Sequence, residues 1–302
     1  MNRQSVVIIL VNWNGQKDTL VCLRSLEKLK SNRYDPILLV VDNASRDDSV
    51  AVLQKQFPKV KRIALPSNRG FTGANNVGMQ WAVDHNVDHV WILNNDTLVD
   101  PNALALFDVF DDPKVGAAGS KIYFAAGAEY HKHKYRKKDL GRVLWFAGGM
   151  LDWDNLYASH RGVDEVDHGQ YNEVEQTDFI TGCSFGMPTR VIRNVGMFDD
   201  KYFAYLEDVD LSFRIQQAGY RTVYNPASIV WHMNASSSGG AGSPMHQYFQ
   251  TRNRLLLGMR HASLRTKFAL MRQAVRHIAG GSPAEKKAVR DAILGRFGAY
   301  HG

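Results

Sequence analysis

Cysteine is scarce in this chain, which holds only Cys22 and Cys183 among its 302 residues. Two cysteines so far apart in sequence make neither a disulfide framework nor a thiolate metal site, so we expect both to be reduced. Long apolar runs are also missing, because the longest, Val6 to Val11, is far shorter than the roughly 20 residues that a membrane-spanning helix needs. The segment before it has no apolar region or cleavage site typical of a signal peptide. We therefore expect a cytoplasmic protein without a transmembrane segment.

Most of the chain lacks an excess of positive charge, although the formal net charge is +7. Residues 246–302 hold eleven Lys or Arg and two acidic residues, which leaves 26 basic and 28 acidic residues in the first 245. A second basic cluster occupies residues 131–138. Both basic segments fit either a solvated surface or a contact with phosphate groups or an anionic membrane face.

Two common nucleotide-binding motifs are missing as well. The exit of the first predicted strand reads Asn12-Trp13-Asn14-Gly15 instead of G-x-G-x-x-G, and no Walker loop of the form G-x-x-x-x-G-K-[ST] occurs. These absences argue against NAD-dependent and P-loop enzymes.

Strand-like and helix-like segments alternate regularly in the first part of the chain. The order is strand 6–11, helix 20–29, strand 37–41, helix 50–57, strand 59–65, helix 75–83 and strand 89–93. A capping box from Ser45 to Asp48 is expected to start the second helix, and Asp100-Pro101 to start the next one. This alternation predicts an α/β fold with a right-handed sheet.

The second half of the chain has a looser pattern, typical of an α+β arrangement. A strand is expected at 115–122, short strands and loops at 141–171 and a helix from Leu211 to Ala218. Helical spacing then runs from Tyr248 to about Arg276, and a Gly-Gly-Ser-Pro break precedes a last short helix.

These patterns predict one domain over residues 1–245 and a basic helical tail over 246–302. Within the domain, we expect residues 1–115 to bind the nucleotide and 116–245 to form the acceptor and catalytic half.

Four predicted strands each end in a polar or glycine-rich cluster. The clusters are Asn12-Trp13-Asn14-Gly15, Asp42-Asn43-Ala44-Ser45, Asn68-Arg69-Gly70-Phe71 and Asn94-Asn95-Asp96. Ligands of open parallel sheets bind outside the carboxyl ends of the strands, so the clusters should line one crevice.

Each charged residue in these clusters has a functional and a structural interpretation. Asp42 could hold ribose hydroxyls or a base N–H, or it could cap a helix or form an Asx turn. Asp96 suits a divalent cation held with substrate phosphates, or it caps a turn. Arg69 lies in a glycine-bearing loop that permits close approach to an anion, or the loop is a structural turn.

The second half contributes an acidic cluster and a histidine. Glu207, Asp208 and Asp210 lie where a helix should begin, and they either complement its dipole or include a general base. His232 follows an apolar run, where a lone histidine is often structural. The Ser- and Gly-rich segment 234–243 is expected to be mobile enough to close over a ligand.

The segments together resemble the inverting GT-A glycosyltransferases of family two, and more narrowly their rhamnosyltransferase-like and galactofuranosyltransferase-like branch. The resemblance covers roughly residues 5–255. Besides the four strand-end clusters, it depends on three segments: Thr181-Gly182-Cys183, Tyr205-Leu206-Glu207-Asp208-Val209-Asp210 and Val230-Trp231-His232.

The resemblance implies a nucleotide-diphospho-sugar donor, a divalent Mn²⁺ or Mg²⁺ ion and a catalytic base. The implied metal ligands are Asp96 and His232, the implied base is Asp208, and Glu207 is the second candidate for the base. The implied donor-binding residues are Asn12, Asn14, Asp42, Asn43, Arg69, Asn95 and Arg252. Arg252 belongs to a segment similar to the family's basic helix, although a solvated helix face explains it equally well. The chain departs from the family's D-x-D pattern because Asn94 replaces the first Asp.

The implied reaction is transfer of a sugar to a polysaccharide or lipid-linked acceptor. The resemblance favours dTDP-rhamnose as the donor, with a UDP-sugar second, and peripheral contact with the inner face of the membrane is a further hypothesis. Two alternatives are a nucleotidyltransferase, which usually has a basic glycine-rich loop after the first strand, and a non-catalytic polyanion-binding protein. The latter leaves the acidic residues 207–210 without a purpose, so nucleic acid is not the expected partner.

Overall fold

A mixed ten-stranded sheet forms the centre of the computed structural model, which describes residues 3–233 and 242–300. The strand order is β10-β12-β6-β11-β4-β1-β2-β3, with β5 paired to β12 and β7 to β6. The strands are β1 (Gln4–Asn12), β2 (Tyr34–Asp42), β3 (Lys61–Ala64), β4 (His89–Asn94), β5 (Thr97–Val99), β6 (Val115–Phe124), β7 (Leu144–Phe146), β10 (Glu175–Gln176), β11 (Ser184–Pro188) and β12 (Arg221–His232). A separate hairpin consists of β8 (Gly149–Asp152) and β9 (Tyr157–His160).

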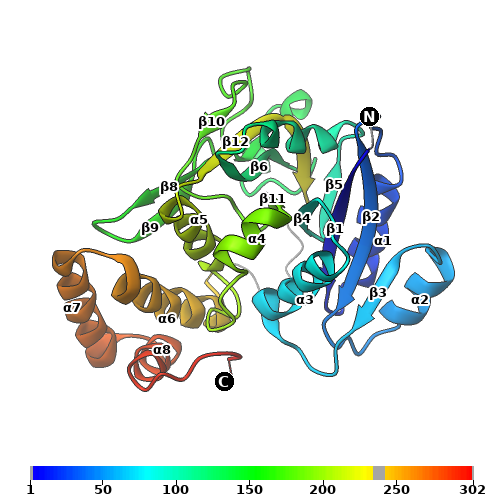
Figure 1. Ribbon diagram of the computed structural model, residues 1–302. Coiled ribbons are helices and arrows are strands. Elements are labelled where there is room, and N and C mark those ends of the chain that lie inside the picture. Colours follow the sequence, from blue (N-terminus) through cyan, green and yellow to red (C-terminus); the bar gives the residue numbers. More distant parts are fainter. Residues whose placement is uncertain (1–2, 234–241, 301–302) are drawn as a thin grey trace.

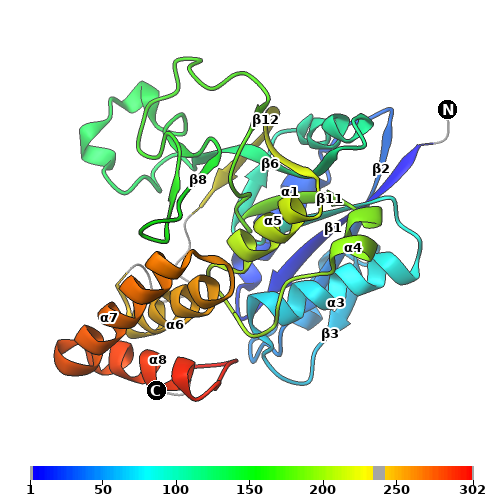
Figure 2. The same ribbon diagram turned by 60° about the vertical axis from the view of Figure 1, so that its left-hand side comes forward.

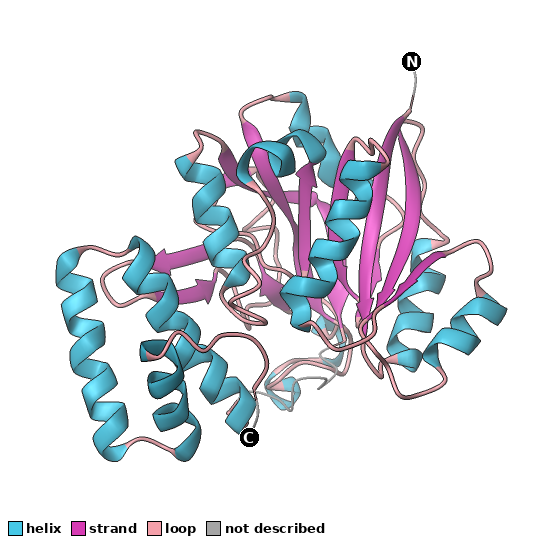
Figure 3. Cartoon of the chain, turned by 60° about the horizontal axis from the view of Figure 1, so that its bottom comes forward, coloured by secondary structure: helices cyan, strands magenta, loops and turns pink. Residues whose placement is uncertain are grey.

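Helices cover both faces of the sheet (Figure 3). The α-helices are α1 (Gln16–Leu26), α2 (Ser49–Gln56), α3 (Gly70–Asp84), α4 (Thr189–Val195), α5 (Glu207–Gln217), α6 (Pro244–His261), α7 (Leu264–Gly280) and α8 (Pro283–Ile293). Three 3₁₀ segments complete the set: η1 (Ala103–Asp111), η2 (Lys132–Lys134) and η3 (Lys137–Asp139). The expected α/β fold with an α+β second half is confirmed.

The apolar run of β1 is buried on both sides of the sheet. Val6, Ile8 and Leu10 contribute to one hydrophobic core, and Val7 and Ile9 to the other. Successive side chains of a strand point to opposite faces, so a strand covered on both faces has no polar alternation. The first core contains residues of α1 and η1, and the second contains residues of α3, α4 and α5.

The sheet is parallel where the sequence alternates and mixed elsewhere. β1 pairs in parallel with β2 and β4, and β2 pairs in parallel with β3. β11 lies antiparallel between β4 and β6, and β12 runs parallel to β6. The carboxyl ends of β1, β2, β3 and β4 therefore meet at one edge, next to the start of α3 (Figure 1).

Two expected helix starts are wrong. The Oγ of Ser45 contacts Asn12 and Asn14 instead of capping a helix, and α2 begins after Asp48 with no side-chain cap. The segment after Asp100-Pro101 forms the 3₁₀ helix η1, which begins after Asn102.

The expected single helix from Tyr248 to Arg276 is also wrong, because it is divided into α6 and α7. Ser263 separates the two and caps α7 by accepting a hydrogen bond from the backbone N–H of Thr266. The predicted boundary between residues 245 and 246 falls inside the first turn of α6. Figures 1 and 2 show α6, α7 and α8 as a helical group beside the sheet domain, at one end of the molecule. Within the described residues, no helix is both long and apolar enough to cross a bilayer.

Candidate active site

The ends of β1, β2 and β4 bring the predicted polar clusters to one place. Asn12 and Asp42 are opposite each other in the parallel register, and Val11 is opposite Asn94. The buried Asn12 donates its side-chain amide to Asp42 Oδ1 at 2.8 Å and to Ser45 Oγ at 3.0 Å. The expected clustering at the carboxyl edge of the sheet is confirmed.

Asp42 takes part in a turn as well as in this cluster. Its Oδ2 accepts the backbone N–H of Ser45, three residues further along the chain, at 3.0 Å and so closes a turn. Asn14 lies beside this turn in a left-handed conformation, with φ of 54°, and its Oδ1 accepts the N–H of Arg46. The structural interpretation of Asp42 is confirmed, and its contact with a nucleotide stays a prediction.

Asn43 orders the loop that begins α3. Its Nδ2 donates to Asn68 Oδ1 and to the carbonyl of Gly70, and its Oδ1 accepts the N–H of Arg69 at 2.8 Å. The guanidinium of Arg69 pairs with Asp200 at 3.4 Å, where both side chains are about half exposed. Asn43 therefore has a structural role, whereas a long, solvated ion pair is the only polar contact of the Arg69 side chain among the described residues.

Thr19, which the sequence did not single out, links the first and fourth clusters. Its hydroxyl donates to Asn12 Oδ1 at 2.8 Å and accepts the amide of Asn95 at 2.8 Å. The signal that could have indicated Thr19 is its position, since it is a polar residue one turn into the helix that follows β1. The polar network thus continues from Asp42 through Asn12 and Thr19 to Asn95.

Asp96, the residue after Asn95, forms a buried pair with His232. His232 Nε2 lies 3.2 Å from Asp96 Oδ1, and the side chains are 9% and 10% exposed. The pairing of β5 with β12 fixes this contact, because His232 is opposite Thr97 and the N–H of Met233 donates to the Asp96 carbonyl. Two neighbouring ligands of an octahedral ion at about 2.1 Å lie about 3 Å apart, so the spacing of the pair fits a divalent cation. Among residues 3–233 and 242–300, no third His, Cys, Asp or Glu completes a three-ligand cluster.

Asp18 is a second acidic residue near Asp96 that the sequence did not indicate. Partial burial raises the pKa of Asp18, and the charge of Asp96 adds to this rise. Asp18 lies in the first turn of α1, where acidic residues commonly complement the helix dipole. For this reason its sequence position did not indicate that it lies near Asp96.

The two cysteines both lie near the carboxyl end of β4. Cys22 Sγ lies 3.6 Å from the Thr97 hydroxyl, and the carbonyl of Cys183 accepts the N–H of Asn94. Both thiols are free and buried, and burial raises the pKa of Cys22 to about 12. The two form no disulfide in the described part of the chain, and their reduced state stays a prediction.

The turn of residues 181–183 connects this region to the acidic cluster. The N–H of Gly182 donates to Asp208 Oδ2 at 2.8 Å, and the N–H of Val209 donates to Asp208 Oδ1 at 2.8 Å. A Cβ on Gly182 would lie 2.9 Å from the ring of Phe71, so the close approach requires glycine. One short turn therefore lies between Asp208 and the strand end that holds Asp96.

Glu207 and Asp208 differ in burial. Glu207 is 5% exposed, and its Oε2 has no hydrogen-bond partner within the described residues. Burial, together with the neighbouring charge of Asp208, raises the pKa of Glu207 well above its ordinary value. Burial also raises the pKa of the partly buried Asp208, but the two backbone N–H groups oppose this rise. Both carboxyl groups therefore have raised pKa values, but only Asp208 is oriented by two backbone N–H donors.

The backbone before this pair is strained. Phe203, Tyr205 and Leu206 all adopt left-handed conformations, with φ of 63°, 70° and 67°. Each such residue costs about 1–3 kcal/mol and persists only where its surroundings fix it. Phe203 lies against the start of α3, because its carbonyl accepts the N–H of Thr72 at 3.2 Å.

Helix α6 holds this strained segment from the other side. Asn253 donates its amide to the carbonyls of Tyr202, Ala204 and Tyr205 at 3.0, 2.7 and 2.8 Å. Arg252 is fully buried, and its guanidinium donates to the carbonyls of Lys201, Tyr202 and Gly298. The alternative of a solvated helix face is wrong for Arg252. Its donors are occupied by backbone carbonyls, which does not favour the predicted contact with a diphosphate.

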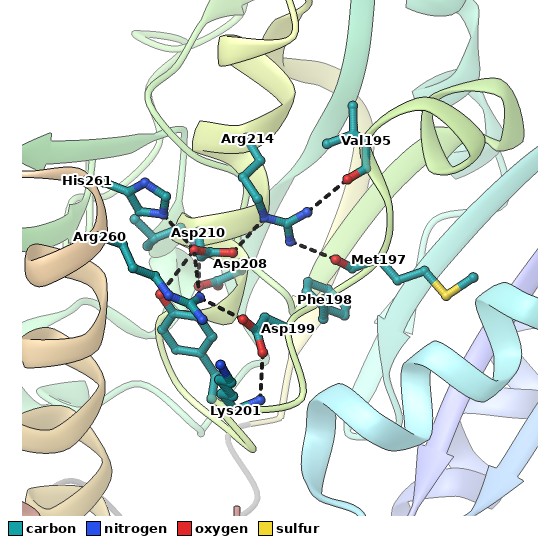
Figure 4. Close-up of polar contacts among 12 residues, drawn as sticks. Val195, Met197, Phe198, Asp199, Lys201, Asp208, Asp210, Arg214, Arg260 and His261 are labelled. Carbon is teal, nitrogen blue, oxygen red and sulfur yellow. Dashed lines mark hydrogen bonds and ion pairs between the residues drawn. The ribbon is translucent and has the colours of Figure 1, made fainter. Parts of the chain in front are cut away.

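Asp210, the third acidic residue of the cluster, has a different environment (Figure 4). Its Oδ2 accepts Arg214 at 2.8 Å, and its Oδ1 contacts His261 at 2.9 Å. Burial acts to raise the pKa of Asp210, but His261 and Arg214 bring it below its ordinary value. This network joins α5 to the end of α6, so Asp210 has a structural role.

Comparisons with known proteins agree with this geometry. The profile of the family described as glycosyltransferase-like family 2 matches residues 3–257. The chain belongs to this family. Its fold is GT-A, as in GalNAc-T7 crystallised with UDP, GalNAc and Mn²⁺, which superimposes with a TM-score of 0.68 at 16% identity over 97% of this chain and 55% of that one. A mannosyltransferase from Pyrobaculum calidifontis, in complex with GDP-Man and Mn²⁺, superimposes with a TM-score of 0.55 at 15% identity, over 98% and 82% of the two chains.

Relatives in sequence include a rhamnosyltransferase and an O-antigen biosynthesis protein. The N-acetylglucosaminyl-diphospho-decaprenol L-rhamnosyltransferase of Mycobacterium tuberculosis is 28% identical over 67% of this family 2 chain and 68% of its own length. The O-antigen biosynthesis protein RfbC of Myxococcus xanthus is 24% identical over 80% of this chain, which spans only 18% of that protein.

Proposed function

We propose that this GT-A protein transfers a sugar from a nucleotide-diphospho-sugar to a hydroxyl of a polysaccharide or lipid-linked acceptor, with inversion at the anomeric carbon. The observation that carries the proposal is the position of Asp208. Its carboxylate is oriented by Gly182 and Val209, one short turn from the strand end that holds the Asp96–His232 pair. A base and a candidate ion site at one sheet edge are what a single displacement requires.

In this reaction Asp208 accepts the proton of the acceptor hydroxyl. At the same time the oxygen of that hydroxyl bonds to the anomeric carbon. The bond between that carbon and the diphosphate breaks, and the nucleoside diphosphate leaves with the electron pair. Asp96 and His232 would hold Mn²⁺ or Mg²⁺, which supplies charge stabilisation for a diphosphate when it is bound. The raised pKa of Glu207 favours its neutral form beside the base.

We propose dTDP-rhamnose as the donor, with a UDP-sugar second. The mycobacterial relative is named a rhamnosyltransferase, and its name includes a lipid diphosphate acceptor, which supports the same classes for this chain. Asn12, Asp42 and Asn95, with Asn14 and Asn43 nearby, line the strand ends on which the nucleoside would lie. A lipid-linked acceptor would bring the enzyme to an anionic membrane surface.

A thermal-shift panel tests the donor, because a ligand that binds only the native state raises its melting temperature. We expect dTDP-rhamnose with Mn²⁺ to give the largest rise, followed by UDP-sugars. NMR of the product, made with the responding donor and a synthetic lipid-diphosphate sugar, then reports the anomeric configuration. Retention of configuration would contradict the single displacement, and no response to any nucleotide sugar would contradict the function.

A further inference from the structure

Helix α7 exposes a continuous apolar stripe. The stripe consists of Leu264, Phe268, Met271, Val275 and Ile278, whose side chains are 85%, 64%, 54%, 65% and 50% exposed. The intervals of four, three, four and three residues place all five on one side of a helix. At 1.5 Å per residue the stripe is about 21 Å long.

The opposite side of α7 is firmly packed, so the helix buries one side and exposes the other. Thr266, Leu270 and Ala274 are buried, and Leu270 belongs to the main hydrophobic core. A Cβ on Gly258 of α6 would lie 2.2 Å from Leu270, which shows how closely α6 and α7 approach. Figures 1 and 2 show α7 at the outer edge of the helical group.

Cations border the stripe on both sides. At about 100° per residue, Lys267 lies along one border, and Arg265, Arg272 and Arg276 lie along the other. Leu264–Gly280 contains no Asp or Glu. Arg265 does pair with Asp154 of the neighbouring hairpin at 2.9 Å, but both side chains are more than two-thirds exposed.

This combination identifies the kind of surface that fits α7. A helix with an exposed apolar face and bordering Lys and Arg binds in the interface plane of a bilayer with anionic lipids. A second copy seated symmetrically on the same face would bring cations against cations, and α7 offers no carboxylate to pair with them.

We propose that α7 docks this protein on an anionic lipid bilayer, with the stripe in the boundary between headgroups and acyl chains and the cations at the headgroups. The inference rests on the proposed function and deepens it, because a lipid-linked acceptor lies at the surface of a membrane. The surface itself is defined by α7 alone.

Flotation of the full chain with lipid vesicles tests the proposal. We expect the protein to float with vesicles of phosphatidylcholine and phosphatidylglycerol, to remain unbound with phosphatidylcholine alone, and to dissociate at high salt. A stripe variant, Phe268→Gln with Val275→Gln, should lose at least about tenfold in partitioning, because it removes two apolar anchors. Arg272→Gln with Arg276→Gln should weaken binding to the anionic vesicles and make it less sensitive to salt.

The matched control is Val50→Gln on α2, where the valine is 38% exposed and lies on another part of the surface. It should float like the original protein. Unchanged circular dichroism of the stripe variant shows that the fold is intact, which the exposure of both side chains predicts. Equal flotation of the stripe variant and the control would overturn the proposal.

Light scattering distinguishes the competing occupant. In the contrary outcome, the original protein fails to float and instead forms a concentration-dependent dimer that the stripe variant abolishes. That result would overturn the bilayer proposal and identify a second copy of the chain as the occupant of the stripe. The donor panel separates this inference from the proposed function, because the stripe variant should keep its nucleotide-sugar thermal shift. Flotation without any thermal shift would leave the docking surface standing and contradict the transferase function.

Discussion

Asn253 on α6 donates its side-chain amide to the carbonyl of Tyr205 at 2.8 Å, and Tyr205 is one of three left-handed residues just before Glu207 and Asp208. The same amide reaches the carbonyls of Tyr202 and Ala204. Side-chain donors on a helix thus fix a backbone that would otherwise relax. Because Asp208 directly follows this segment, we infer that Asn253 is a positioning residue for the proposed base.

Asn253→Ala should lower kcat about tenfold or more and leave the KM for the donor nearly unchanged. The substitution removes the donor for three carbonyls, so the free energy of unfolding should also fall by about 1–3 kcal/mol. Steady-state kinetics and thermal unfolding measure the two effects. The control is Gln250→Ala on the same helix, which should change neither. A normal kcat in folded Asn253→Ala, or a change confined to KM, would show that the segment keeps its shape without this amide.

The assignment of Asp208 as the base predicts a large difference between two adjacent carboxyl groups. Asp208→Asn should lower turnover by roughly 10²- to 10⁴-fold, the usual loss for a positioned base, with donor binding nearly intact. Glu207→Gln should retain most turnover, because the raised pKa of Glu207 favours its neutral form and glutamine has the same shape. Turnover assays of both variants with a fixed donor decide this. The reverse order of effects would move the base to Glu207.

The pH dependence follows from the same pair. Asp208 must be ionised to accept a proton, and burial raises its pKa above the ordinary value of 3.8. Activity should therefore fall as the pH drops through this raised pKa, so the acid limb of the kcat/KM profile should lie above pH 3.8. In Glu207→Gln the limb should stay where it is, since a neutral Glu207 adds no charge to Asp208. A limb that moves to lower pH in this variant would show that Glu207 is ionised in the native enzyme.

The sequence predicted the parallel half of the fold well, because the apolar runs of the strands and the apolar spacing of the helices are both local signals. Apolar runs such as that of β1 and the helical repeats between them identify the elements, and the right-handed rule for parallel crossovers restricts how they connect. The capping box at Ser45 failed because the same hydroxyl has a better position between Asn12 and Asn14. The long C-terminal helix failed because its apolar spacing continues through Ser263, and only the cap shows the break.

The part of the candidate site at the carboxyl edge of the sheet could be predicted because its residues follow strands. The register of the sheet brings Asp42 and Asn12 together, so their positions after strands were sufficient signals. The association of His232 with Asp96, which the pairing of β5 with β12 brings about, was implied only by the resemblance to family two glycosyltransferases. Thr19 and Asn253 act through contacts between elements far apart in the chain, which periodicity does not report. Arg252 illustrates the same limit, because a charged residue on a basic helix is expected to be exposed and is in fact fully buried.

The Asp96–His232 pair gives a prediction for metal-dependent donor binding. Asp96→Asn keeps the size of the side chain and a partner for His232 but removes the negative charge that a divalent cation requires. The affinity for a nucleoside diphosphate in the presence of Mn²⁺ should therefore fall at least about tenfold, while the weak affinity measured with a chelator should stay the same. His232→Gln should have the same effect in smaller measure, since it removes a neutral ligand. Isothermal calorimetry with and without Mn²⁺ measures each difference, and Asp84→Asn, an exposed residue of α3, serves as the charge-matched control. Equal Mn²⁺-dependent binding by Asp96→Asn and this control would exclude the pair as the ion site and leave its 3.2 Å contact as a purely structural link between β12 and the end of β4.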